Sequence, residues 1–126
     1  MEKDDKRDVW LSVLEFLESL QTRILAALDN IYQIIKEPFI LKQPVNFVGN
    51  IGDSAIFHVK AANVASYQWQ NKGTGNWLSP SLPGVGTDTL QAEITSQRLN
   101  FVYRCKLTGT DGSVIYTDEV KMVLEE

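Results

Sequence analysis

The spacing of apolar residues changes abruptly at Pro38, and this change divides the chain into two kinds of structure. Before Pro38, apolar residues recur at alternating intervals of three and four, which is typical of one face of an α-helix. After it, apolar and polar residues alternate with a period of two, which is typical of half-buried β-strands. Because proline disfavours a helical conformation in the residue before it, we expect the helix to end at Lys36 or Glu37. The sequence therefore predicts a helical segment, residues 1–37, followed by a β domain, residues 38–126.

The helical segment carries a seam of apolar residues with strict heptad spacing. The seam consists of Trp10, Val13, Leu17, Leu20, Ile24, Ala27, Ile31 and Ile34. Further apolar residues flank it at Leu11, Leu14, Leu25, Leu28, Tyr32 and Ile35. The resulting stripe is wider than a two-stranded coiled coil requires, so we expect packing against two or more neighbours. One of the aspartates Asp4, Asp5 and Asp8 is expected to cap the start of the helix.

The heptad seam predicts an oligomerising coiled coil, and hence a homo-oligomer. Isoleucine occupies both seam positions of the last repeat, Ile31 and Ile34, which favours three strands over two. Leu20 and Ala27 fit that preference less well. The alternative is that the apolar stripe packs on the β domain of its own chain.

The β domain is organised around Trp69, which lies in the short alternating stretch 67–70. Residues of the kind that would enclose this indole recur on both sides of it: Phe57 and Val59 upstream, and Leu90, Phe101, Tyr103, Cys105 and Leu107 downstream. Turn-forming residues at 50–53, 71–76, 79–86 and 109–112 separate about seven short strands. Pro44 indicates an edge strand. Strict alternation along the last strand would turn Asp118 inward, so we expect a bulge or bend near Thr117 and Asp118.

The stretch from Ile40 to Glu126 resembles the bacterial and bacteriophage immunoglobulin-like domains. The resemblance lies at residues 52–59, 67–70, 77, 82–84, 87–90, 103–105 and 111–112. Trp69 falls at the position of the family's core tryptophan, and Tyr103 precedes Cys105 by two residues, the spacing of a tyrosine corner. Val59 stands where the first cysteine of the antibody pair would lie. The resemblance therefore implies a mainly β fold, an immunoglobulin-like antiparallel sandwich, with Cys105 as an unpaired core thiol.

A heptad helix directly before such a domain is also similar to the layout of small phage fibre and appendage proteins. This resemblance implies a structural or adhesive virion protein of a phage head, tail or baseplate, made in the host cytoplasm. Its partners would be phage capsid or tail proteins, and cell-surface glycans. The alternative is a carbohydrate-binding or protein-binding module of a bacterial surface protein, located at the cell surface or outside the cell.

Composition and charge exclude several other classes of function. The net charge is −4 and the lysines and arginines are scattered, so no nucleic-acid partner is expected. No apolar run approaches the roughly 20 residues of a membrane span. The single histidine, His58, is expected on the solvent face of its strand, and Asp88 and Asp111 are expected to serve turns rather than calcium. We therefore predict no catalytic residue, no cofactor, no metal site and no enzymatic activity.

Trp77 is the one residue that the sequence singles out as a ligand contact. It follows a glycine-rich turn, where an exposed indole presents a flat apolar face on which a sugar ring or a partner side chain can stack. The alternative is that Trp77 covers the edge of the sandwich.

Overall fold

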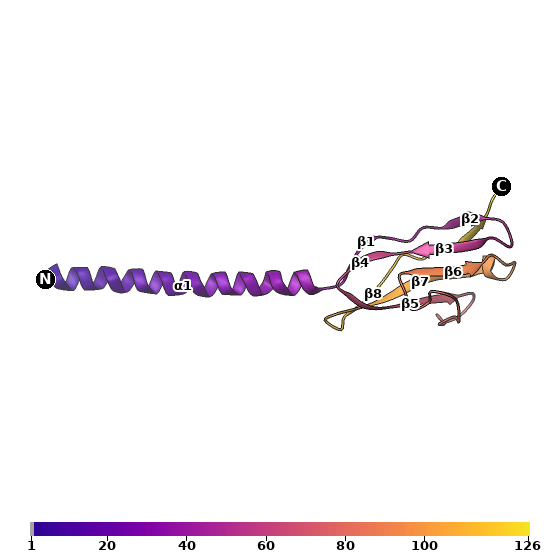
Figure 1. Ribbon diagram of the computed structural model, residues 1–126. Helices are drawn as coiled ribbons and strands as arrows, with labels where there is room; N and C mark the ends of the chain where they lie inside the picture. Colours follow the sequence, from indigo (N-terminus) through magenta and orange to yellow (C-terminus); the bar gives the residue numbers. More distant parts are fainter. Residues whose placement is uncertain (1) are drawn as a thin grey trace. The chain divides into compact units, whose positions relative to one another are not determined.

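The computed structural model describes the backbone of residues 2–126 and the side chains of residues 6–126, and the chain divides into two units after Lys36. The first unit is helix α1 (Glu2–Lys36). The second unit contains nine strands and one short 3-10 helix within the described residues (Figure 1). An all-helical segment is thus followed by an all-β one, as the change of apolar spacing at Pro38 predicted.

Helix α1 ends at Lys36, as predicted, and begins earlier than its aspartates suggested. Since α1 starts at Glu2, the aspartates Asp4, Asp5 and Asp8 lie within its first turns, and the expectation that one of them caps the helix is wrong. Glu2 and Lys3, which precede these aspartates, are of residue types that favour helices, so the helix includes them.

The strands of the second unit are short and several are interrupted. They are β1 (Phe39–Lys42), β2 (Phe47–Gly49), β3 (Ser54–His58), β4 (Lys60–Ala62), β5 (Val64–Lys72), β6 (Thr89–Glu93), β7 (Val102–Gly109), β8 (Val114–Tyr116) and β9 (Met122–Leu124), with the 3-10 helix η1 (Arg98–Asn100) before β7. The structure has nine segments where about seven strands were predicted, and irregular residues separate neighbouring segments at 43–46, at Val59 and at 117–121.

The strands pair in four ladders that share one core. The largest sheet has the order β5-β7-β8 and is antiparallel, with Trp69 opposite Cys105. Strands β3 and β6 pair antiparallel in a second ladder, and so do β1 and β4. Strands β2 and β9 form the one parallel pair among the described residues. The inward faces of the β3-β6 ladder and the β5-β7-β8 sheet meet, which makes the unit a sandwich.

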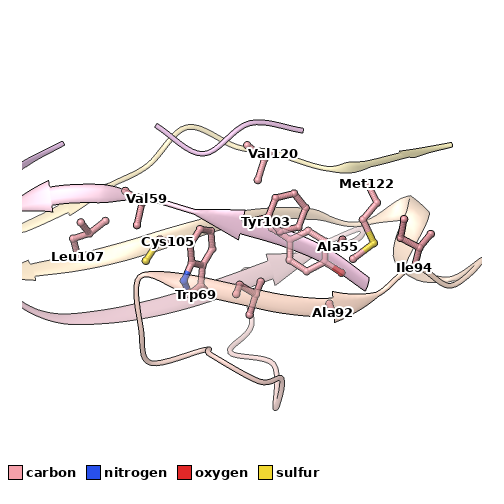
Figure 2. Packing of buried hydrophobic residues seen from close by; sticks show 12 residues of the cluster. Ala55, Val59, Trp69, Ala92, Ile94, Tyr103, Cys105, Leu107, Val120 and Met122 are labelled. Atoms are coloured by element: carbon pink, nitrogen blue, oxygen red, sulfur yellow. The ribbon is translucent and has the colours of Figure 1, made fainter. Parts of the chain in front are cut away.

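Alternation along the strands places the core residues as the sequence predicted, except that Phe101 precedes β7 and packs against the core only partly buried. Phe57, Val59, Trp69, Tyr103 and Cys105 are fully buried, and Figure 2 shows their neighbours in the same cluster. The remaining core members are Ala55, Leu90, Ala92, Ile94, Leu107, Val120 and Met122. The Phe57 ring lies 5.4 Å from the Tyr103 ring and 6.4 Å from the Trp69 ring, measured between centroids. Three aromatic side chains therefore form the centre of the sandwich.

The indole nitrogen of Trp69 also has a defined partner. Its N–H donates to the carbonyl oxygen of Thr87 over 2.8 Å. A buried tryptophan needs such an acceptor, because an unpaired N–H in the core is costly. The loop 79–88 is thereby attached to the core by the residue around which the domain is built.

The last strand is broken where the sequence predicted a bend, between β8 and β9. Thr117 is buried, and its hydroxyl accepts a hydrogen bond from the backbone N–H of Cys105 over 2.8 Å. The Gln43 side-chain carbonyl accepts from the N–H of Asp118 over 2.9 Å, and the Asn46 side chain accepts from the N–H of Lys121 over 2.9 Å. Side chains thus satisfy the backbone donors that a continuous ladder would have paired.

Candidate functional site

Helix α1 exposes its whole apolar stripe within its own unit. Exposure of the seam side chains runs from 38% at Leu20 to 67% at Trp10, and Ala27 is exposed as well. The flanking residues Leu11, Leu14, Leu25, Leu28, Tyr32 and Ile35 are at least half exposed. Contiguous apolar surface on this scale marks an interaction surface in soluble proteins. The seam residues predicted for oligomerisation therefore share one apolar face of α1, and that this face joins copies of the chain stays a prediction.

A second surface lies on the outer side of the β5-β7-β8 sheet. Residues that alternate with the buried ones point outward there, and the register places Gln70 opposite Arg104 and Lys106 opposite Tyr116. Trp77, beyond the end of β5, joins them, because Leu78 bridges back to Asn71. We call this surface the basic aromatic face and define it by Lys72, Trp77, Arg104, Lys106 and Tyr116.

Arg104 is the centre of the basic aromatic face. Its guanidinium carbon lies 4.1 Å from the centroid of the Trp77 ring and 3.9 Å from that of the Tyr116 ring. Its Nε donates to the side-chain oxygen of Gln70 over 2.9 Å. Two cation–π contacts and one hydrogen bond hold the side chain in a single arrangement.

Trp77, the predicted ligand contact, is half-buried and already has cationic partners. Besides Arg104, the Lys72 ammonium lies over the ring, 4.8 Å from its centroid. At least one indole face on which we expected a sugar or a partner side chain to stack is therefore in contact with the chain's own cations. Whether Trp77 binds a ligand stays a prediction.

The sequence did not indicate Arg104 and Tyr116 as members of a site. The alternation that buries Tyr103 and Cys105 sends Arg104 outward, so its position on the outer face was predictable. Its contact with Trp77 depends on how the turn 73–76 returns the chain to β5, which spacing alone does not specify. Tryptophan, tyrosine and arginine are the residue types that dominate binding energy at interfaces, and their presence is the one compositional signal that would have drawn attention to this site.

Cys105 is a buried free thiol, as the resemblance implied. Burial is the largest cause that raises its pKa from the usual 9.0 to about 12, because a thiolate would be poorly solvated in the core. The thiol is therefore protonated at neutral pH and is a weak nucleophile. Its role is that of a small apolar core residue.

Tyr103 keeps the spacing of a tyrosine corner but lacks its hydrogen bond. Among the described residues, no partner accepts or donates at the buried Tyr103 hydroxyl. Burial raises the pKa of this hydroxyl, while Arg98 and the nearby Asn71 side chain oppose the shift. The ring fills the core beside Phe57, and its packing is what the fold uses.

The remaining polar residues considered from sequence have local partners. His58 is exposed, and its Nδ1 lies 2.9 Å from the Thr89 hydroxyl, which in turn donates to the Asp88 carboxylate over 3.0 Å. The Asp111 carboxylate accepts from the N–H and the hydroxyl of Ser113 within its turn. Among the side chains of residues 6–126, no group of three or more His, Cys, Asp or Glu is placed to hold a metal ion.

Over the described part of the chain, neither α1 nor the short helix η1 combines the length and apolar character that spanning a bilayer requires.

Comparisons with known proteins support the sandwich fold and identify no family. No protein-family model matches the chain, and no curated protein matches it. Solved structures do resemble it. The titin M10–obscurin-like 1 Ig complex is 18% identical, with a TM-score of 0.51, over 71% of this chain and 94% of that one. The N-terminal eight Ig domains of Down syndrome cell adhesion molecule are 16% identical, with a TM-score of 0.57, over 71% of this chain and 12% of that one. The second unit therefore has an immunoglobulin-like fold.

Proposed function

We propose that this protein is a non-enzymatic homo-oligomer that gathers immunoglobulin-like domains through its helices and displays them for attachment. The observation that supports the proposal is the continuous apolar stripe of α1, which is exposed along the whole helix. Isolated helices gain little stability from propensity alone, so most helical stability comes from packing of an apolar face. The occupant of the stripe is a further copy of α1, because the seam keeps heptad spacing throughout.

A trimer is the assembly that we favour. Ile31 and Ile34 occupy both seam positions of the last repeat, which favours higher-order coiled coils over dimers. The flanking residues Leu14, Leu28 and Ile35 widen the stripe so that each helix can contact two neighbours. Three identical helices would cover this surface, whereas two would leave the flank in water.

Measurement of mass in solution tests the oligomer directly. Light scattering of the full chain at micromolar concentration should give about three times 14.2 kDa. The double variant Ile24→Lys and Ile31→Lys should lower the mass to that of a monomer, because it places charges in the seam. The matched control Ser19→Lys and Gln33→Lys adds the same charge at hydrophilic helix positions and should leave the mass unchanged. A monomeric wild-type chain would contradict the proposal.

Assembly would make weak single-site contacts useful for attachment. Linking several binding sites raises overall avidity by roughly 10²–10⁴ when their geometry permits simultaneous binding. The contacts are proposed to come from residues 72–77 and 82–88 of each sandwich, with Trp77 among them. In a binding assay on whole bacteria, Trp77→Ala should weaken binding of the intact oligomer. Unchanged binding would remove Trp77 from the site.

We further propose that the display takes place on a phage particle, as part of its head, tail or baseplate. The resemblance to bacteriophage immunoglobulin-like domains and to small fibre proteins supports this setting, with capsid or tail proteins as neighbours. Gold-labelled antibody against the sandwich should decorate purified particles at one position. Detection of the protein on the bacterial surface, and not on particles, would favour a surface module instead.

A further inference from the structure

The basic aromatic face carries positive charge in a protein that is acidic overall. Strands β5, β7 and β8 contain Lys72, Arg104 and Lys106 and no acidic residue. In the whole chain, by contrast, acidic residues outnumber basic ones by 16 to 12. A positive surface on an acidic protein favours a negatively charged partner through complementary potentials.

The guanidinium of Arg104 is positioned before any partner arrives. The Trp77 and Tyr116 rings both contact the guanidinium, and Nε donates to the side-chain oxygen of Gln70. Among the described residues, no hydrogen bond or ion pair engages its two terminal nitrogens. An arginine held in this way loses little conformational freedom when it forms a bidentate pair with a carboxylate.

The positive charge of Arg104 has no internal counter-ion. Within the described side chains, residues 6–126, its contacts are the two rings and Gln70, and no carboxylate forms an ion pair with it. Lys72 contacts only the Trp77 ring in the same part of the chain. A cation that serves only the fold would gain from a neighbouring carboxylate, and the sandwich places none on these strands.

We infer that the basic aromatic face binds an acidic segment of a protein partner, with one Asp or Glu carboxylate seated on the terminal N–H groups of Arg104. Lys72 and Lys106 would attract the neighbouring acidic residues. The inference deepens the proposed attachment function, since it names the chemistry of what the sandwich attaches to. Each copy of the sandwich carries the complete face, so single-site binding does not require the helix to assemble.

Composition and geometry favour a protein over a glycan or a nucleic acid. Tryptophan, tyrosine and arginine are the residues that dominate binding energy at protein interfaces, and here all three are in contact. A sugar would stack on the indole face, which Arg104 and Lys72 already contact. Three basic residues in a protein of net charge −4 provide too little positive surface for strong binding to a phosphate backbone.

Titration of the full chain with an acidic peptide tests the inference. The probe is a hexapeptide of alternating glycine and glutamate, and the matched probe replaces each glutamate with glutamine. NMR signals of the Trp77 indole N–H and the Arg104 Nε–H should shift with the glutamate peptide and not with the glutamine peptide. The shift should weaken as salt is added.

Variants locate the carboxylate. Arg104→Gln should weaken binding of the glutamate peptide about tenfold or more, the usual loss when a charge-assisted pair is removed. The control Lys60→Gln removes one positive charge from exposed β4 and should change affinity less than about twofold. Arg104→Lys keeps the positive charge but not the bidentate geometry, so it should bind the glutamate peptide more weakly than wild type. It also provides a second test in case the glutamine variant does not fold. Equal binding by wild type and both Arg104 variants would overturn the inference.

Two further outcomes separate this inference from its alternatives. Sialyllactose, a carboxylate-bearing oligosaccharide, should shift the same signals less than the peptide at equal concentration; a larger shift would overturn the choice of a protein partner.

In the Ile24→Lys and Ile31→Lys variant, the peptide should bind each sandwich as tightly as before. Binding by a monomeric chain would therefore sustain the inference even if the oligomer were disproved, and no binding by an assembled chain would disprove the inference alone.

Discussion

The helix and the sandwich of this protein are both rich in large apolar side chains. The sandwich buries these side chains, whereas the helix leaves them exposed. In the sandwich, Phe57, Trp69, Tyr103 and Leu107 are fully buried by residues of their own unit. In α1, Trp10, Leu17, Ile24 and Ile34 are all at least half exposed. A sheet that faces another sheet completes its core within one chain, whereas a single helix has no second layer to cover its stripe. The comparison shows that the sandwich buries its large apolar side chains within its own unit, while α1 leaves its stripe exposed.

The largest effect should come from separating the two regions. Deletion of residues 1–37 removes the stripe and leaves every core residue of the sandwich in place. The remaining domain should be a soluble monomer with an unfolding transition close to that of the sandwich in the full chain. Light scattering and thermal unfolding check both points. A deleted chain that still assembles would show that the sandwich, and not the helix, holds the oligomer together.

A tryptophan in each region sharpens the comparison. Trp69→Ala should destabilise the sandwich by about 3–5 kcal/mol, because it opens a large cavity and leaves the Thr87 carbonyl without its donor. Trp10→Ala, at the first seam position, should leave the unfolding free energy of the sandwich unchanged and act on assembly alone. Urea unfolding followed by near-UV circular dichroism measures the first effect. Similar losses in both variants would mean that the two units fold as one.

The regularity of each region decided how much of it could be predicted. Alternation in β3, β5 and β7 gave the core residues, because a period of two leaves only one side of a half-buried strand for apolar side chains. The helix was predictable in the same way from its heptads, and Pro38 gave its end. Its start was not predictable, since Glu2 and the following charged residues fit either a helix or a cap.

The irregular parts of the fold depend on contacts between segments that are distant in the sequence. Such contacts cannot be predicted from the spacing of apolar residues along the chain. The bend near Asp118 was predicted from the alternation, but its hydrogen bonds with Gln43, Asn46 and the backbone N–H of Cys105 were not. The same limit applies to the candidate site. Alternation predicts that Arg104 faces outward, while its position between Trp77 and Tyr116 arises from three separate segments.

The bend in the last strand should have a moderate effect of its own. Thr117→Val keeps the size of the side chain but removes the acceptor for the backbone N–H of Cys105, which is buried. The loss should be about 1–3 kcal/mol of unfolding free energy, the cost of one buried unsatisfied donor. The control Thr108→Val, on the outward side of β7, should change stability by less than about 0.5 kcal/mol. Equal values for both variants would mean that the Thr117 hydroxyl is dispensable at the bend.

The smallest effect at neutral pH is expected at Cys105. The native thiol should resist a thiol reagent at pH 8 and react once the sandwich is unfolded in urea, because it is buried and its pKa is raised to about 12. Cys105→Ser should leave the mass of the oligomer unchanged.

The raised pKa of Cys105 also gives its contribution to stability a direction with pH. The folded chain holds the thiol proton more tightly than the unfolded chain, whose thiol has a pKa near the usual 9.0. The contribution is therefore complete below about pH 9 and is lost as the pH rises toward 12. Burial also raises the pKa values of Tyr67 and Tyr103. Their contributions to stability are likewise lost as the pH rises, and equally so in wild type and in Cys105→Ser. Urea unfolding between pH 8 and pH 11 should show a steeper loss of stability for wild type than for Cys105→Ser. Parallel curves, or rapid labelling of the native thiol, would place Cys105 outside the closed core that distinguishes the sandwich from the helix.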